Sequence, residues 1–421
     1  MALAAATTWE IRTTGADTNG GGFVTGASGT DRSQQDAAFA SGTDLAVHAS
    51  TNTYVKPDSS YTPVSADIGN LIQITAGTGW TTGFYQITGI SSGYWTLDRS
   101  PAATGTTGGT YAMGGALATP PSSAIVASNT VFIKAGTYTT STGFTFPKES
   151  SVRGYGSTRD DCPSFAAMPV VKASANSITL LSFSAERANI SYLCADGNGY
   201  SSITGFGSAA GGTRQYCKAV SCNIGFSGGY VISSVTSNCK TGASSAKTFL
   251  CNLECGSIAS SVCNSGGSAY YCVIRNATNG IATTGGLDAV GCAFYNISGN
   301  AIHCIGGFPL FRVINCVFVT VGGYAISTAG AICVFGAGNA TYNCTSGFAS
   351  AYKTQLLSAP IVLTANPFVD AANGDYNLNN VAGGGKDCRA AGIGPVGQTS
   401  SIDIGAVQHA DAGGVIVVEE D

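Results

Sequence analysis

The sequence predicts an all-β protein whose main part is a solenoid of short strands, a parallel β-helix. Charged residues make up only 10% of the 421 residues, against about 25% in a typical soluble domain, and 58 glycines fill much of the difference. Helix surfaces are usually rich in Glu, Lys and Arg, so this composition disfavours long helices. Short β-branched runs broken by Gly and Asn indicate strands and turns instead.

The middle of the chain repeats with the period of such a solenoid. Steps of 21, 20 and 24 residues separate Cys251, Cys272, Cys292 and Cys316, and Cys217 fits the same alignment. Three isoleucines that follow the next turn keep step with them, namely Ile281, Ile302 and Ile326. A coil of 20–24 residues has room for three short strands and the turns between them, so the repeat indicates stacked coils.

The fifteen cysteines are open to two interpretations, a disulfide framework or reduced, buried thiols. The odd count and a first stretch of sequence that does not resemble a signal peptide favour thiols. Residues stacked coil upon coil lie about 4.8 Å apart, which lets thiols pack as a column but orients them poorly for bridging. Cys162, Cys194 and Cys388 fall outside the regular repeat, and for them a disulfide remains an alternative. Asn276 and Asn296 are expected to form a side-chain ladder.

Composition and turn signals divide the chain into four segments. We expect residues 1–35, which are polar and Gly-rich, to be an extended N-terminal docking arm, or else a flexible terminus. Hairpin signals predict a small antiparallel β-barrel or β-sandwich over 36–115. The parallel β-helix follows over 116–350, and 351–421 is a closing β segment with an acidic tail. The arm and the closing segment are expected to cover the open ends of the solenoid.

Two stretches carry a resemblance to a known superfamily. Residues 129–138 and 151–156 read "V-x-I-x-x-G-x-Y" and "V-x-G-x-G", which resembles the opening coils of pectate-lyase-like right-handed parallel β-helices. Residues 366–378 and 403–406 resemble the closing pattern "D-P-x-F-V-D-x-x-x-G-D-Y-x-L" and "D-I-G-A". Asn366 replaces the usual first Asp, and one residue is missing after Pro367. The resemblance implies a right-handed solenoid and leaves the activity open.

Acidic side chains are too sparse in the coils to predict a catalytic site. Hydrolases of this fold need paired carboxylates, and lyases need a carboxylate-bound Ca²⁺ with a basic residue. Residues 163–350 hold only Glu186, Asp196, Glu254 and Asp288. Their spacing places no two on one face, although a site shared between subunits stays open. We therefore predict no catalytic, cofactor-binding or metal-binding residues; an enzyme, if it were one, would be a polysaccharide lyase or glycoside hydrolase.

Other candidates for chemistry are each explained more simply. We expect Asp160 and Asp161, with Arg159, to cap a turn rather than bind a cation. The three histidines, His48, His303 and His409, lie far apart in the sequence, and Cys251 and Cys255 lack the second pair of a zinc site. Gly20–Gly22 and Gly383–Gly385 lack the Lys-Ser/Thr that would follow in a phosphate-binding loop.

The sequence as a whole looks like phage surface β-helix proteins, and this predicts a structural role. A net charge of −4 without basic runs argues against nucleic acid, and no apolar stretch is long enough for a membrane span. We predict a homotrimeric capsid decoration (cement) protein or similar appendage on the virion surface, made in the host cytoplasm. It would bind the major capsid protein or another virion protein through its arm. The alternatives are a tailspike that binds or degrades a host surface glycan, and a bacterial cell-surface adhesin.

Overall fold

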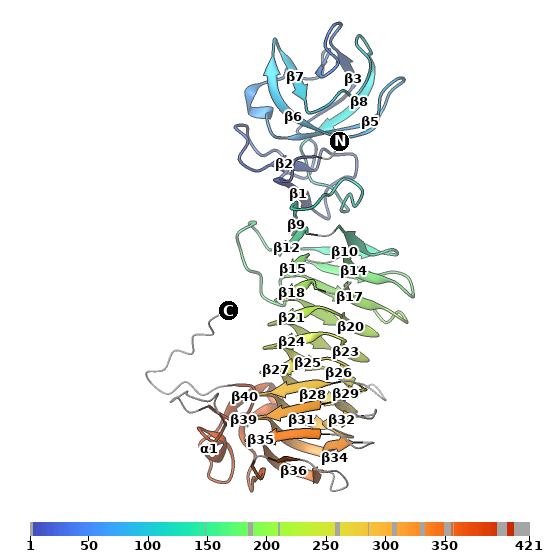
Figure 1. Cartoon of the computed structure of the whole chain (residues 1–421). Coiled ribbons are helices and arrows are strands. Elements are labelled where there is room, and N and C mark those ends of the chain that lie inside the picture. The colour runs from blue at the N-terminus through green and yellow to red at the C-terminus, as the bar shows by residue number, and fades with distance from the viewer. Residues whose placement is uncertain are drawn as a thin grey trace. The chain divides into compact units, whose positions relative to one another are not determined.

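The computed structural model describes residues 3–147, 149–183, 188–208, 211–256, 262–284, 286–304, 310–328, 333–348, 355–356, 358–393 and 402–407. They form strands and turns almost throughout (Figure 1), and long rows of parallel strands confirm the predicted parallel β-helix. The chain divides into two compact units, residues 1–196 with 207–217 and residues 197–206 with 218–421. In the described residues no helix is long and apolar enough to cross a membrane.

The N-terminal unit contains the first coils. One row of strands comprises β2 (Gly22–Val24), β1 (Thr7–Ile11), β9 (Thr130–Lys134), β12 (Ser151–Tyr155), β15 (Asn189–Ser191) and β18 (Thr213–Gln215), parallel except for β2. A second row comprises β10 (Thr137–Thr140), β11 (Phe144–Phe146), β13 (Val170–Ala173), β14 (Thr179–Phe183) and β16 (Cys194–Asp196). The register places Trp9, Val131 and Val152 one above another, and all three are buried.

A small barrel lies between β2 and β9 in the sequence, within the predicted range 36–115. Six antiparallel strands close in the order β3 (Ala40–Val47), β4 (Tyr54–Pro57), β7 (Tyr94–Leu97), β6 (Gly83–Ser91), β5 (Leu71–Ala76) and β8 (Gly109–Met113). Ser92 and Gly93 both have positive φ, which suits the tight hairpin turn between β6 and β7. One short helical turn, η1 (Ser65–Asp67), precedes β5.

The first residues are not the extended arm that the sequence predicts. Strand β1 pairs in parallel with β9, and Trp9 and Ile11 are fully buried. The Trp9 indole donates a 3.0 Å hydrogen bond to Asn129 and meets the ring of Phe84 from the barrel edge-on at 5.1 Å. Residues 7–11 therefore belong to the solenoid, because their apolar side chains complete its interior. Within 1–35, residues 12–21 between β1 and β2 and residues 25–35 of the loop between β2 and β3 lie outside the strands.

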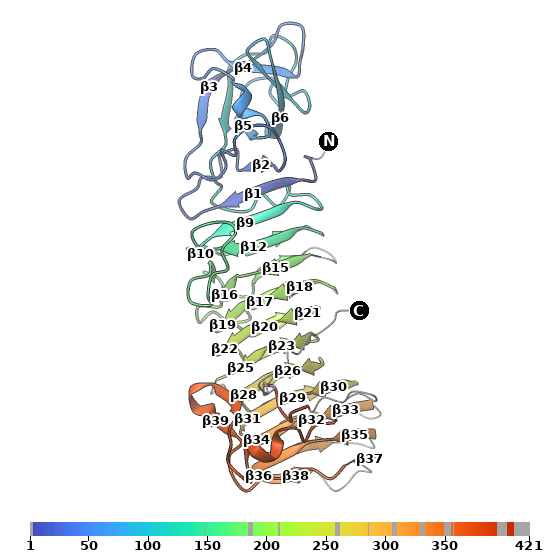
Figure 2. The ribbon, with the colours of Figure 1, turned by 90° about the vertical axis from the view of Figure 1, so that its left-hand side faces the viewer.

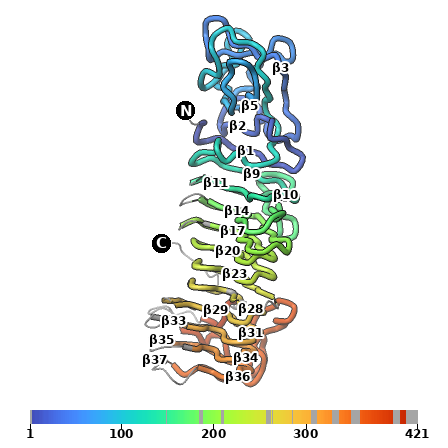
Figure 3. Tube along the Cα trace, turned by 90° about the vertical axis from the view of Figure 1, so that its right-hand side faces the viewer, coloured from blue at the N-terminus to red at the C-terminus, as the bar shows by residue number. Residues whose placement is uncertain are grey.

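The C-terminal unit also consists of rows of parallel strands (Figure 3). One row comprises β21 (Tyr230–Ile232), β24 (Lys247–Phe249), β27 (Ala269–Tyr270), β30 (Leu287–Val290), β33 (Leu310–Ile314), β35 (Cys333–Ala337) and β37 (Gln355–Leu356). The other comprises β17 (Thr204–Ser208), β19 (Lys218–Val220), β20 (Ile224–Ser227), β22 (Val235–Ser237), β23 (Thr241–Ser244), β25 (Asn252–Glu254), β26 (Val262–Ser265), β28 (Val273–Ala277), β29 (Asn279–Thr283), β31 (Ala293–Ile297), β32 (Ile302–Cys304), β34 (Val317–Thr328), β36 (Ala340–Phe348) and β38 (Ile361–Val362). Ile281, Ile302 and Ile326 pair in register, as their spacing predicts.

The closing segment contains β39 (Phe368–Asp370), η2 (Ala371–Asn373), β40 (Asp375–Leu378) and the short helix α1 (Gly385–Cys388). It lies along the flank of the coils, beside β31 and β34 (Figure 2), rather than across an end as expected. Phe368, Tyr376 and Leu378 pack on outward-facing apolar residues of these strands, including Ala293 and Val319. This flank of the coils is apolar, and the closing segment shields it from solvent. The sequence of the closing segment alone did not indicate which surface of the coils it would cover.

Candidate functional site

The three described acids of residues 163–350 each lie beside a cation. Asp196 is 4.0 Å from Lys172, Glu254 is 2.8 Å from Arg275, and Asp288 is 2.7 Å from the Nε of Arg312. Glu254 and Asp288 stand on strands of different rows. Glu186 lies outside the described residues. Within the C-terminal unit, the two described acids of residues 163–350, Glu254 and Asp288, therefore do not lie on the same row of strands.

The surroundings of Glu254 explain its position. Its second oxygen accepts a 2.8 Å hydrogen bond from the amide of Asn276, which in turn accepts one of 2.8 Å from Asn296. These two amides form the side-chain ladder that the repeat predicts. Arg275 also donates to the hydroxyl of Tyr376 at 3.3 Å, so the carboxylate helps to hold the closing segment. The group is engaged in binding neighbouring coils together rather than facing a ligand.

An aromatic row of one exposed and two half-buried rings runs over three coils of the C-terminal unit. The rings of Tyr230, Phe249 and Tyr270 follow one another at centroid distances of 6.5 and 4.8 Å in stacked orientation. Tyr230 is 40% exposed, and the ammonium of Lys247 lies 5.7 Å from its ring centroid. Phe249 and Tyr270 stack because the register of their strands pairs them, whereas Tyr230 is paired with Lys247 and reaches Phe249 from a neighbouring position.

Charged groups continue this row. The hydroxyl of Tyr270 donates a 2.9 Å hydrogen bond to Asp288, and the hydrogen bonds of Arg312 lower the pKa of that carboxyl. The arrangement offers aromatic edges, hydroxyls and an ion pair to solvent, which suits adhesion to another surface. The carboxylate is already neutralised by Arg312, so it is poorly placed to act as a general acid or base.

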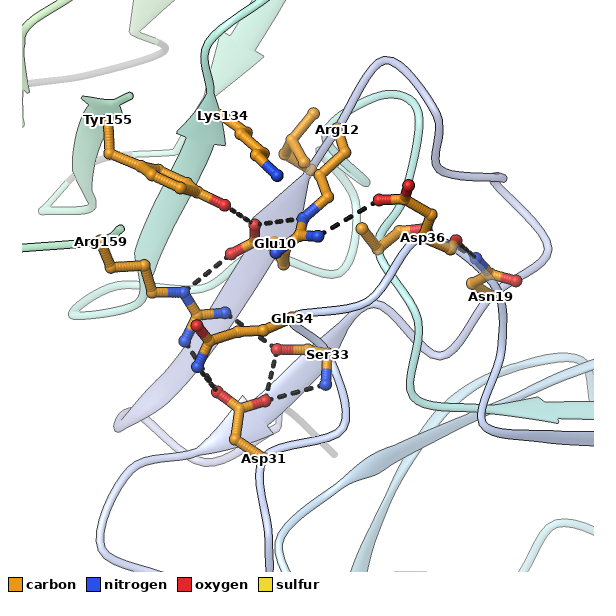
Figure 4. A network of polar contacts seen from close by, with 12 residues as sticks. Glu10, Arg12, Asn19, Asp31, Ser33, Gln34, Asp36, Lys134, Tyr155 and Arg159 are labelled. Atoms are coloured by element: carbon orange, nitrogen blue, oxygen red, sulfur yellow. Dashed lines mark hydrogen bonds and ion pairs between the residues drawn. The ribbon is translucent and has the colours of Figure 1, made fainter. Parts of the chain in front are cut away.

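A dense polar cluster lies in the N-terminal unit, around Glu10 (Figure 4). This carboxylate is fully buried and receives hydrogen bonds from Tyr155, Arg12 and Arg159, the last two at 2.8 Å. Arg159 also reaches Asp31 at 2.8 Å and the hydroxyl of Ser33 at 2.9 Å (Figure 4). The cluster thereby fastens the loop between β2 and β3 to the first coils.

Burial makes this cluster a structural fastening rather than a reactive centre. Tyr155 is 1% exposed, and burial together with the charge of Glu10 raises the pKa of its hydroxyl. A substrate in solvent has no access to either group. Sequence reasoning missed the cluster because Glu10 is a single acid in a short strand, and its partners lie up to 149 residues away.

The predicted turn at Asp160–Asp161 is present. The carboxylate of Asp161 accepts backbone hydrogen bonds from Gly156 and Ser157, both at 2.6 Å, and from Thr158 at 3.0 Å. The bond from Gly156 is the main reason why the pKa of Asp161 is lowered. The capping role predicted for the acids is therefore confirmed at Asp161.

The remaining candidates lie apart. The ring of His48 packs between Tyr54 and Tyr94 in the barrel, His303 stands on β32, and His409 lies outside the described residues. Within the described ranges, no group of three or more His, Cys, Asp or Glu side chains is placed to hold a metal ion. The glycine runs bond to their own chain: Gly20 donates to Gly114, and Gly385 donates to Asn379.

The repeated cysteines form a buried thiol column. We use this name for Cys251, Cys272, Cys292 and Cys316, which are at most 2% exposed. The residues that follow them pair strand to strand, Asn252 with Val273, Val273 with Ala293, and Ala293 with Val317. All thirteen cysteines whose side chains are described carry thiols, Cys162, Cys194 and Cys388 among them.

No protein-family model matches the chain, and no curated protein matches it either. Among solved structures, it is similar to ORF18 of Geobacillus virus E2, with 14% identity over 56% of this chain and 52% of that one, and a TM-score of 0.42. It is similar to the tailspike of Acinetobacter phage vB_ApiP_P1, with 14% identity, 51% and 43% coverage and a TM-score of 0.30. A pectate lyase matches with 12% identity, 70% and 92% coverage and a TM-score of 0.32. The chain thus spans about half the length of the two viral proteins.

Proposed function

We propose that this chain is a non-enzymatic structural protein of a bacteriophage particle surface, a capsid decoration (cement) protein or similar appendage. The observation that carries the proposal is the use of its acids: Asp196, Glu254 and Asp288 each lie beside a cation. A stack of coils held in this way offers a stiff outer surface on which these three acids are engaged in ion pairs. The assignment to a bacteriophage particle is supported by the resemblance of the whole sequence to phage surface β-helix proteins, and this is an analogy of fold.

The proposed partners are two further copies of the chain and a major capsid or other virion protein. The virion contact is proposed for the loop between β2 and β3, where Phe39 is 36% exposed. Arg159 anchors this loop through Asp31, so a partner would meet a fixed surface. Light scattering on the purified chain should give the mass of a trimer, and a monomer at micromolar concentration would contradict this part of the proposal.

A tailspike that binds a host glycan is the second candidate, and the aromatic row favours it. Tyrosine rings and hydroxyls are suited to sugar surfaces, although Phe249 and Tyr270 stack on each other and present mainly their edges. Incubation with purified capsular and lipopolysaccharide glycans separates the candidates, with reducing ends and unsaturated sugars as the readout. We expect no turnover; sustained release of fragments would overturn the non-enzymatic proposal.

The location on a particle is tested by immunogold labelling of gradient-purified virions with an antibody against the barrel. The proposal predicts regular labelling of the capsid or of an appendage, at a constant copy number per particle. A chain that stays in the soluble fraction of the lysate and never labels particles would contradict it.

A further inference from the structure

The four thiols of the thiol column are stacked at a regular spacing, and filling the core does not by itself require this spacing. Its four cysteines occupy the same position in successive coils, and the backbone hydrogen bond from Val273 to Cys251 repeats from Ala293 to Cys272 and from Val317 to Cys292. The side chain of Cys272 interacts with those of both Cys251 and Cys292, and Cys292 interacts in turn with Cys316. Neighbouring sulfurs therefore point the same way from a ladder with a repeat of about 4.8 Å.

This spacing is too wide for a disulfide. A disulfide needs sulfurs at about 2.05 Å and Cβ atoms at about 3.8 Å, so two adjacent coils would have to close by about 1 Å. The coils are fixed by strand pairs on both sides of the column, such as Ile274 with Phe294. Oxidation would thus have to distort the ladder.

The spacing fits a metal ion between two thiolates. A thiolate bond to a d¹⁰ cation is about 2.3 Å long, as for zinc, so two such bonds in a straight line span about 4.6 Å. Each of the four thiols also donates to the carbonyl two residues before it, at 3.2 to 3.4 Å, so the four side chains are oriented alike. Zinc itself prefers four ligands, and no group of three or more suitable side chains surrounds one point in the described residues.

We propose that the thiol column is a binding site for soft d¹⁰ cations that take two linear ligands, with Hg²⁺ as the best-matched ion. One ion lies between Cys251 and Cys272, and a second lies between Cys292 and Cys316. Two S–H bonds break and two Hg–S bonds form at each site, both protons pass to solvent, and nothing is oxidised or reduced.

Charge selects the ion. A divalent cation with two thiolates is neutral, so it adds no net charge to an interior in which Ile274 and Phe294 are fully buried. A monovalent ion such as Cu⁺ leaves one negative charge per site, which burial disfavours. The hydrogen bonds lost on metal binding are weak, for example the 3.4 Å bond from the thiol of Cys292 to the carbonyl of Val290.

The experiment is equilibrium dialysis of the full chain against Hg²⁺ buffered with excess glutathione, which removes ions held by single thiols. Bound mercury is counted by mass spectrometry for the wild type, for the double variant C272S/C292S, and for C304S. Serine already occupies the column position in the preceding coil at Ser234, so the double variant should fold. Cys304 is the matched control, because it is equally buried but lies between Thr283 and Thr328.

We expect the double variant to bind two fewer ions than the wild type, and C304S to bind the same number. Equal binding by the wild type and the double variant would overturn the proposal, as would an equal loss in C304S. If the double variant fails to fold, X-ray absorption on mercury in the wild type decides. Two sulfur neighbours support linear sites, and three or four refute them.

Discussion

At the scale of residues, the repeated cysteine is explained by the bend that precedes it. The residue before each thiol is left-handed, with φ of 53° at Leu250 and 52° at Tyr271. Such a bend leaves a carbonyl two residues before the cysteine, and the thiol donates to it, at 3.2 Å for Cys251 and 3.3 Å for Cys272. Ser234 makes the same bond at 2.8 Å. A thiol is small and apolar, so it fills the core, and its S–H is a weak donor, so it also satisfies the hydrogen-bonding capacity of this carbonyl.

The fastening around Glu10 predicts a large difference between two arginine variants. Arg159→Met leaves the fully buried Glu10 with one cation fewer and also frees Asp31, so we expect a loss of about 3 kcal/mol in unfolding free energy. Arg312→Met breaks an ion pair whose arginine is 55% exposed, and its expected cost is about 0–1 kcal/mol. Urea denaturation of both variants measures this, and equal losses would refute the role given to Glu10.

The turn at Asp161 predicts a pH dependence. Its pKa is lowered from the model-peptide value of 3.8, chiefly by the hydrogen bond from Gly156. A carboxyl with a lowered pKa in the folded state stabilises the fold above its unfolded pKa, and this contribution is lost as the pH falls through the folded value. Asp161→Asn should therefore flatten the fall in stability below about pH 4. Thermal unfolding from pH 7 to pH 2.5 tests this, and an unchanged slope would count against it.

At the scale of elements, periodic segments could be predicted and isolated ones could not. The column cysteines and the isoleucines Ile281, Ile302 and Ile326 recur at the coil period, so the sequence reveals the coils. The pair Ser92–Gly93 likewise indicates the hairpin turn in which it lies. Strand β1 has five residues and no repeat of its own, and it contains two threonines and Glu10, so its sequence reads as polar. Its place depends on Tyr155 and Arg159, distant partners that no local pattern reveals.

The closing segment predicts an effect confined to one element. Leu378 on β40 is 4% exposed and packs with Tyr376 against the outward face of the coils. Leu378→Asp would place a charge in this contact, so the segment should detach and be cleaved by protease at least about tenfold faster. Asn377→Asp, at an exposed neighbouring position, serves as the control. Cleavage that spreads equally through the coils, or no change in rate, would contradict the separate packing of this segment.

At the scale of the whole molecule, the described acids of residues 163–350 form ion pairs within the coils. The separation of Glu254 and Asp288 on different rows of strands follows from their spacing, because a solenoid converts sequence period into position. The contact between Phe249 and Tyr270 follows from the same step of 21 residues that separates Cys251 from Cys272. The contact of Tyr230 with Phe249 could not be predicted in this way, because the register pairs Tyr230 with Lys247. The interior repeats from coil to coil: the thiols of the column recur there, and so do stacked rings such as Phe294 and Phe318.

The central claim is that this interior is held by reduced thiols, and a count of reactive thiols tests it most directly. Native protein should react rapidly with iodoacetamide at Cys162, the exposed cysteine among those described, while the column stays protected. After denaturation without reductant, every one of the thirteen described cysteines should be alkylated, as shown by peptide mass spectrometry. Disulfide-linked peptides that join column cysteines in freshly purified protein would contradict the account.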